Sequence, residues 1–274
     1  MSATGGLLAG RRGLIMGVAN EKSIAWGIAK AAADQGAQLA FTYQNESFLR
    51  RIEPLARSVG SEVLLPCDVA EDSDLDAAFA RLREHWDSLD FVVHAIAYSD
   101  KSQLKGRYVE TTRQNFRHTM SISCYSFTGV AQRAAPMMNA GGSLLTLTYL
   151  GAERVAPNYN VMGVAKAALE ASVRYLAADL GPRDIRVNAL SAGPMRTLSG
   201  SAVAGARNTF RYAAEQAPLH RNVDLAEVGN AGLYLLSPLS EGVTGEVHHV
   251  DAGAHAIAMP HPDRVGTKGD NGRS

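Results

Sequence analysis

Short apolar runs rich in Val, Ile and Leu alternate along this chain with longer stretches of helical periodicity, and this alternation constrains the fold more than any other feature. The apolar runs read GLIMG, AQLAFTY, EVLLPCD, DFVVHAIA, SLLTLT, DIRVNAL and GEVHHVD. Their nearly continuous hydrophobicity is typical of strands that are buried on both faces of a parallel sheet. We therefore predict an α/β fold, a single-domain Rossmann-like doubly wound parallel sheet of about seven strands with helices on both faces.

One domain is predicted to cover residues 1–274, because no linker rich in Pro, Gly or Ser divides the chain and no repeat of solenoid period is present. Two segments interrupt the alternation. Residues 196–215 are rich in small side chains and are expected to form a mobile helical flap over a site. Residues 261–274 are polar and are expected to form a disordered tail.

Charge and composition narrow the classes of partner. Lys plus Arg and Asp plus Glu number 27 each, so no net field indicates nucleic acid or an anionic membrane as a partner. No apolar run approaches the roughly 18 residues of a membrane span, and the first arginines follow a short apolar patch, unlike a signal peptide. We expect a cytoplasmic protein without a metal site, whose two cysteines, Cys67 and Cys124, are buried and reduced.

The turn after the first predicted strand reads GVANEKSIAWG. In an open parallel sheet this turn is where a dinucleotide places its pyrophosphate, against free backbone N–H groups. The turn lacks a GxGxxG motif, but Gly17 would allow a close backbone approach. Ser23 stands at the expected helix N-cap, where its hydroxyl can serve both the helix and a phosphate. An ordinary N-cap after a tight turn would account for the same residues; the location in the first turn favours a cofactor.

Residues after the second predicted strand bear on the choice of cofactor. An NADP site usually has a nearby Arg or Lys for the 2′-phosphate. Here Gln44 and Asn45 follow the strand, and the first basic side chain is Arg50. We therefore expect NADH rather than NADPH.

Two tyrosines and a lysine are predicted to lie at the ligand-binding edge of the sheet. Tyr149 ends the strand SLLTLT, and residues 158–180 keep apolar side chains at helical spacing, with Asn158 available as the N-cap. If Tyr159 and Lys166 both lie on this helix, they share a face with a rise of about 10 Å between them. That distance leaves Tyr159 protonated, as a neutral donor. The alternative is a half-buried tyrosine and a lysine that reaches to water.

The order of elements, a lysine in the helix after the fifth strand and AGPMRT after the sixth resemble the short-chain dehydrogenase/reductase superfamily. Ordinary members place a Tyr four residues before the Lys and a Ser about a dozen residues before the Tyr, where this chain has Met162 and Tyr149. The chain is instead similar to a divergent branch, the bacterial NADH-dependent enoyl-[acyl-carrier-protein] reductases. The spacing Tyr, nine residues, Tyr, six residues, Lys is met by Tyr149, Tyr159 and Lys166.

Further stretches extend this resemblance from about residue 8 to residue 259. The Gly-x5-Ser-x-Ala loop of the family is met by Gly17, Ser23 and Ala25, and TYQNE, CDVAED, RVNALSAGPMRTL and GVTGEVHHVDAG are also similar. The resemblance implies an enzyme of type II fatty-acid biosynthesis that reduces the C2=C3 double bond of trans-2-enoyl thioesters by hydride transfer from NADH.

The resemblance also implies a role for each matching residue. Tyr159 would bond the thioester oxygen, Tyr149 would line the acyl site, and Lys166 would hold the nicotinamide ribose. The other implied cofactor contacts are Gly17, Ser23, Ile24, Gln44, Asp68, Val69, Ile96, Met195 and Thr197.

The chain departs from the family in HAIA, where the family usually has HSIG. Ala95 and Ala97 therefore replace Ser and Gly, and Ala97 is expected to border the substrate and to alter the fit of acyl chains and inhibitors. The implied partners are an acyl carrier protein thioester as substrate and further copies in a homotetramer, paired through helices at about 111–135 and 158–180. Two alternatives remain: a short-chain reductase for enoyl-CoA or another conjugated carbonyl, and a non-catalytic NAD-binding sensor, which would have no need of both tyrosines and the lysine.

Overall fold

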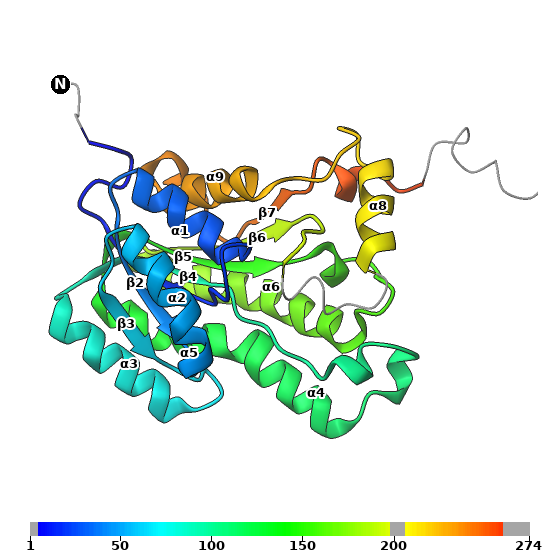
Figure 1. Ribbon diagram of the computed structural model, residues 1–274, viewed down its shortest axis with the longest axis horizontal. Helices are drawn as coiled ribbons and strands as arrows, with labels where there is room; N and C mark the ends of the chain where they lie inside the picture. The colour runs from blue at the N-terminus through cyan, green and yellow to red at the C-terminus, as the bar shows by residue number, and fades with distance from the viewer. Residues whose placement is uncertain (1–4, 198–205, 260–274) are drawn as a thin grey trace, which may run out of the picture.

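The computed structural model describes residues 5–197 and 206–259. The expected disordered tail, 261–274, lies outside these residues, as does the part of the expected flap that spans 198–205. Residues 206–215 of that segment lie in helix α8 (Ala206–Gln216), which stands beyond the carboxyl ends of the strands at the right of Figure 1.

Within the described residues, seven parallel strands form one sheet in the order β3-β2-β1-β4-β5-β6-β7, which confirms the predicted fold class (Figure 1). All seven predicted strands are present. They are β1 (Arg12–Met16), β2 (Gln38–Tyr43), β3 (Val63–Pro66), β4 (Leu89–His94), β5 (Met138–Thr148), β6 (Arg186–Ala192) and β7 (Val247–Val250).

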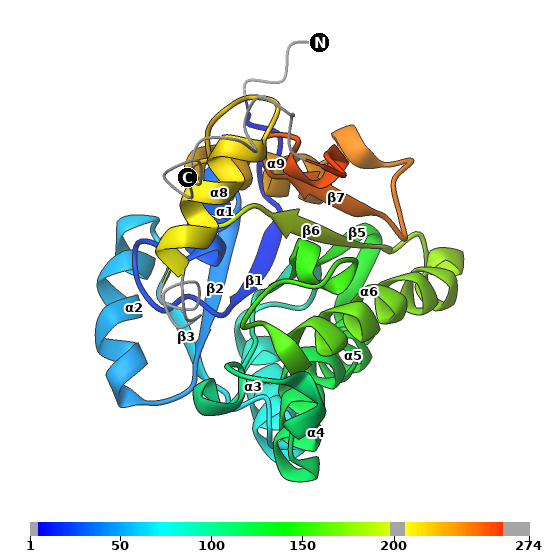
Figure 2. The same ribbon diagram turned by 90° about the vertical axis from the view of Figure 1, so that its right-hand side faces the viewer.

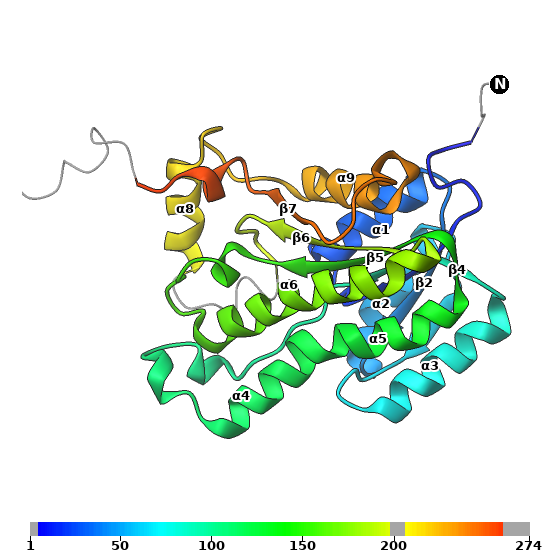
Figure 3. The ribbon, with the colours of Figure 1, turned by 180° about the vertical axis from the view of Figure 1, so that it is seen from behind.

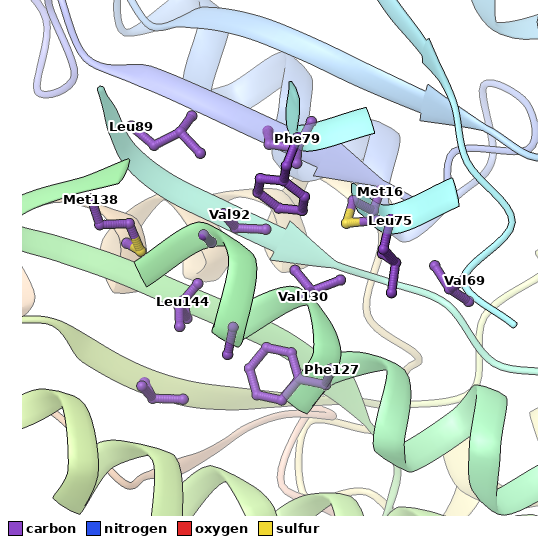
Figure 4. Close-up of a cluster of buried hydrophobic side chains, with 14 of the residues drawn as sticks. Met16, Val69, Leu75, Phe79, Leu89, Val92, Phe127, Val130, Met138 and Leu144 are labelled. Atoms are coloured by element: carbon purple, nitrogen blue, oxygen red, sulfur yellow. The ribbon is translucent and has the colours of Figure 1, made fainter. Parts of the chain in front are cut away.

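Helices cover both faces of the sheet (Figure 1 and Figure 2). One face packs against α1 (Ile24–Asp34), α2 (Glu46–Ser58) and α9 (Leu225–Leu236). The other packs against α3 (Asp72–His85), α5 (Ser126–Ala134) and α6 (Asn160–Leu180). Figure 4 shows this second layer, where Phe79 of α3 and Phe127 of α5 meet Val92 of the sheet. The near-continuous apolar strands are thus buried on two sides, as their composition indicated.

Strand order reverses between β1 and β4, so the chain leaves β1 in one direction and β4 in the other. In open parallel sheets this reversal opens a crevice at the carboxyl ends of the two strands, and ligands bind there. The turn after β1 and the loop after β4 lie at this point. Among the described helices, none is long and apolar enough to cross a bilayer.

The helix expected at about 111–135 is interrupted. Helix α4 (Arg113–Met120) passes into a π turn (Ser121–Tyr125) before α5 begins, and in Figure 3 the path runs beside α6. Hydrophobic periodicity does not reveal such a turn, because one extra residue per turn shifts the pattern only locally. Both cysteines are buried and free, as predicted.

The start of α6 differs from the prediction. The helix begins at Asn160, and Tyr159, not Asn158, occupies the N-cap. Asn158 and Asn160 have φ of 59° and 38°, in the left-handed region that Asn tolerates better than most residues. Asn158 therefore turns the chain into the helix instead of capping it.

Candidate functional site

The rings of Tyr149 and Tyr159 meet edge to face at the carboxyl end of β5. Their centroids lie 5.1 Å apart and their planes cross at 71°. Tyr159 also packs on a small apolar cluster that includes Leu104 and Met162. A Cβ at Gly151 would lie 2.5 Å from Cδ1 of Tyr159, so only glycine at 151 leaves room for this ring. The predicted juxtaposition of the two tyrosines is present, although Tyr159 precedes the helix.

Both phenols are held in the protonated state. Burial raises the pKa of Tyr159 above its ordinary value, and the neighbouring Tyr149 and Glu170 raise it further. Burial also raises the pKa of Tyr149, with a contribution from Asp251. At neutral pH the pair therefore offers O–H donors, as expected from the distance between Tyr159 and Lys166.

Lys166 does not reach to water. Only 6% of the residue is exposed, and Nζ donates a hydrogen bond of 2.8 Å to the carbonyl oxygen of Leu147 on β5. Burial lowers the pKa of Lys166 to about 8, which leaves the ammonium form dominant at neutral pH. Two of its three N–H donors remain for other acceptors. The alternative of a solvated lysine is excluded.

The turn after β1 is shaped by Gly17 and Ser23. Gly17 has φ of 96°, and a Cβ there would lie 2.2 Å from the carbonyl oxygen of Ala95, so this residue lets the turn approach the loop after β4. Ser23 is the N-cap residue of α1, but its side chain makes no cap hydrogen bond, so that part of the prediction is wrong. Its Oγ instead accepts from the N–H groups of Ala19 (2.9 Å) and Asn20 (3.1 Å), because the turn folds back over it.

The ends of β2 and β3 are joined by side chains. Nε2 of Gln44 donates to Oδ2 of Asp68 over 2.9 Å, and Oδ1 of Asp68 accepts from the N–H of Ala70 at 3.0 Å. Asn45 is occupied as the N-cap of α2. The side chain of Val69 is buried in the core beside Leu75 (Figure 4), so a ligand here would meet its backbone. The carboxyl ends of β2 and β3 therefore carry the carboxylate of Asp68, at a place where the 2′-phosphate of NADPH would need a cation.

The remaining predicted residues lie at the start of α1 and in the loops after β4 and β6. Ile24, the first residue of α1, is half-buried against the core. After β4, Ile96 is half-buried and Ala97 is exposed. After β6, Met195 packs against the core, and its carbonyl oxygen accepts a hydrogen bond of 2.9 Å from the N–H of Thr197. The predicted cofactor positions are thus distributed along the carboxyl edge from β3 to β6.

A buried polar layer behind this edge was not predicted. It consists of His94 at the end of β4 and of Ser123 and Ser126 in and after the π turn, all fully buried. A histidine inside the apolar run DFVVHAIA, and two serines three positions apart in SISCYS, were the available signals. Gly163 was also missed: a Cβ there would lie 2.7 Å from the carbonyl oxygen of Gly151.

A family model described as "Enoyl-(Acyl carrier protein) reductase" matches residues 17–255, which include every position of the site described above. The chain belongs to this family. Within the described residues, no group of His, Cys, Asp and Glu is arranged to hold a metal ion.

Named relatives agree with the family model. "Enoyl-[acyl-carrier-protein] reductase [NADH] 2" of Rhizobium meliloti (strain 1021) is 60% identical over 93% of this chain and 95% of its own length. The solved structure of FabI from Candidatus Liberibacter asiaticus is 53% identical, with a TM-score of 0.92 over 94% of this chain and 100% of that one. An enoyl-(acyl-carrier-protein) reductase from Anaplasma phagocytophilum, solved in complex with NAD, is 56% identical, with a TM-score of 0.91 over 94% and 98% of the two chains.

Proposed function

We propose that this site reduces the C2=C3 double bond of trans-2-enoyl thioesters carried on acyl carrier protein, with hydride from NADH, as a step of type II fatty-acid biosynthesis. The chain is an NADH-dependent enoyl-[acyl-carrier-protein] reductase, in agreement with relatives of that name at 50–60% identity. The observation that carries the proposal is the pair of protonated phenols, with ring centroids 5.1 Å apart, at the end of β5, the strand whose Leu147 carbonyl oxygen accepts a hydrogen bond from the buried ammonium of Lys166.

The turn after β1 suits the pyrophosphate of the cofactor. Both lone pairs of Ser23 Oγ are used by backbone N–H groups, so its hydroxyl can act only as a donor, which an anionic oxygen accepts. Gly17 keeps a side chain out of the crevice, and Ile24 begins the helix whose N-terminal N–H groups favour negative charge.

The other assigned contacts divide by the part of NADH that they meet. Gln44, Asp68 and the backbone of Val69 are assigned to the adenosine, and their acidic surroundings favour NADH over a 2′-phosphorylated cofactor. Ile96 is assigned to the ribose region. Met195 and Thr197 are assigned to the nicotinamide carboxamide and the phosphates.

Tyr159 is the electrostatic catalyst in this proposal. Bound NADH supplies a hydride to C3 of the substrate, and negative charge then collects on the thioester oxygen. The phenol of Tyr159 stays protonated because burial raises its pKa, so it donates a hydrogen bond to that oxygen. One well-placed donor of this kind lowers the barrier by about 3–4 kcal/mol.

Lys166 and Tyr149 support this step. The two N–H donors of Lys166 that Leu147 does not use are assigned to the ribose hydroxyls of the nicotinamide half. Tyr149 packs edge-on against Tyr159 and lines the acyl path, which Ala97 borders on the side of β4.

We include a homotetramer and a cytoplasmic location in the proposal. Large apolar side chains are exposed on the helices expected to pair: Phe116 of α4, Tyr125 of the π turn, and Val164 and Tyr175 of α6. Exposed apolar residues gathered on adjoining helices are typical of a protein interface. Light scattering coupled to size exclusion measures the assembly: a monomeric mass would contradict this part.

The central experiment follows NADH oxidation with trans-2-enoyl thioesters of acyl carrier protein and of CoA. We expect the carrier-protein thioester and NADH to give the highest kcat/KM. A clear preference for the CoA thioester would favour the alternative reductase. NADH binding without turnover of either substrate would favour a sensor.

A further inference from the structure

The π turn rearranges the hydrogen bonds around Ser126. The backbone N–H of Ser126 reaches the carbonyl oxygen of Ser121, five residues back, and not that of Ile122, four residues back. The hydroxyl of Ser126 donates to the carbonyl oxygen of Ile122 instead, over 2.6 Å. Because its proton is used in this way, Ser126 Oγ faces the sheet as an acceptor.

That acceptor fixes the ring of His94, the last residue of β4. Nε2 lies 2.8 Å from Ser126 Oγ, and an N–H donated by Nε2 would complete this pair. Nδ1 lies 3.2 Å from Oγ1 of Thr146 on the neighbouring strand. The imidazole is therefore held between α5 and β5 in one orientation.

Ser123, three residues before Ser126, forms hydrogen bonds with the backbone of Tyr98, four residues beyond His94. Its hydroxyl donates to the carbonyl oxygen of Tyr98 and accepts from the N–H of the same residue, each over 2.9 Å. The last sheet bond of this segment is that from the N–H of Ala95 to the carbonyl oxygen of Met16. The hydroxyl of Ser123 thus supplies both a donor and an acceptor to the backbone of Tyr98, which lies beyond the end of the sheet. A neighbouring strand would supply the same two groups.

Ile96 and Ala97 lie between these two attachments. We propose that Ser123, through the backbone of Tyr98, and Ser126, through the ring of His94, are positioning residues that fix the loop carrying Ile96 and Ala97 for cofactor and acyl binding. This inference rests on the proposed function, which assigns Ile96 to the cofactor and Ala97 to the substrate.

Loss of either hydroxyl would release the loop more than it would disturb the core. In Ser123→Ala, the N–H and carbonyl groups of Tyr98 lose the one hydroxyl that both use, so the loop is free to move until other partners satisfy them. A moved loop displaces Ile96 from the cofactor. The loss of two neutral hydrogen bonds corresponds to roughly a 5- to 150-fold change in an equilibrium constant.

The first test compares Ser123→Ala with Ser143→Ala by direct titration of NADH fluorescence. Ser143 is also buried, and its hydroxyl donates to a backbone carbonyl, that of Leu235, but it pairs with Phe91 on β4, away from the carboxyl edge. We expect Ser123→Ala to raise the Kd for NADH at least fivefold and Ser143→Ala to leave it unchanged. Thermal melting is recorded for both. Equal NADH affinity in the two variants would overturn the role of Ser123.

Ser123→Cys provides a second variant in case Ser123→Ala does not fold. The thiol keeps the volume but is a weak donor and acceptor, so the Kd for NADH should fall between those of wild type and Ser123→Ala. A wild-type Kd in the cysteine variant would contradict the inference.

A double-mutant cycle tests the path through His94. If Ser126 acts on the loop by way of the ring, then Ser126→Ala and His94→Gln should each weaken NADH binding, and the double variant should be no weaker than His94→Gln alone. Additive losses would overturn this path. Failure of the proposed function would instead appear as wild-type protein that binds NADH normally but does not reduce enoyl thioesters.

Discussion

The ring of Tyr159 lies edge-on to that of Tyr149, and the space that it occupies is defined by the backbone at Gly151. Gly151 belongs to a turn that begins at Tyr149. This turn is closed by a hydrogen bond from the N–H of Ala152 to the carbonyl oxygen of Tyr149. Both phenols therefore depend on one short turn after β5, and their relative placement is set by backbone geometry before any ligand binds.

Replacing Tyr159 by Phe should slow enoyl reduction by about 10²–10³-fold in kcat, because the donor to the thioester oxygen is lost. The Kd for NADH should stay within about twofold, since the proposed function assigns the phenol to the substrate oxygen and not to the cofactor. Tyr175→Phe is the matched control, because Tyr175 lies on α6, the helix that follows Tyr159, and is 76% exposed. Steady-state kinetics and NADH titration of the two variants decide the matter; a kcat loss shared by both would contradict the role of Tyr159.

Gly151→Ala should damage the site through its Cβ alone. Gly151 does not have a positive φ, so alanine fits its backbone, but the new Cβ would lie 2.5 Å from the ring of Tyr159. We expect a stability loss of about 1–3 kcal/mol and a reduced kcat as the ring shifts. Gly181→Ala, which has no atom within 4 Å of its Cβ, should change neither. Urea denaturation and kinetics would show this, and a fully active Gly151→Ala would mean that the ring position is not critical.

NADH binding should weaken as pH rises through about 8, the pKa of Lys166. Below this pKa the side chain is an ammonium with charge-assisted donors for the ribose, and above it the charge is lost. Fluorescence titration from about pH 6.5 to 9.5 measures the effect. Lys166→Met should bind NADH more weakly at all pH values and without this dependence. A pH-independent Kd in the wild type would argue against a ribose contact.

His94 should make the protein sensitive to acid. Burial, with the nearby charge of Lys166, lowers the pKa of His94 from 6.5 to about 3, so the folded protein keeps the ring neutral where the unfolded chain binds a proton. The contribution of the neutral ring to the free energy of unfolding is therefore fully present above pH 6.5, and it is lost progressively as the pH falls toward 3. At about pH 4.5 the loss is roughly 2–3 kcal/mol. His94→Gln should reduce the change in urea midpoint between neutral pH and that pH. An identical change in both proteins would mean that His94 protonates freely.

The strands and the family motifs could be predicted from the sequence because each depends on local pattern. Apolar runs such as DFVVHAIA indicate buried strands wherever they occur, and the spacing of Tyr149, Tyr159 and Lys166 is a property of the chain itself. The order of the strands could not be read in this way, since pairing partners such as β1 and β4 are separated by two intervening strands in the sequence.

The errors in the site have tertiary causes. Asn is a residue type that is common at helix N-caps, so Asn158 was predicted to cap α6. In the structure Tyr159 packs on Leu104 and Met162 and occupies the N-cap position instead. Ser23 also looks like a cap, but the preceding turn uses its oxygen. The roles of Ser123 and Ser126 depend on a π turn that only the folded surroundings specify.

The pairing of β1 with β4 also has a consequence for the kinetics of folding. Each half of the sheet, β1 to β3 and β4 to β7, joins strands that follow one another in the sequence, whereas Gly13 of β1 meets Phe91 of β4 across the longest separation of any strand pair. Contacts of this kind form late, because closing the intervening chain costs entropy first. The turn at Gly17 and the loop at Ala95 lie on opposite sides of this junction. A cofactor bound to both would hold the two halves together, so its presence should slow unfolding as well as serve the reaction.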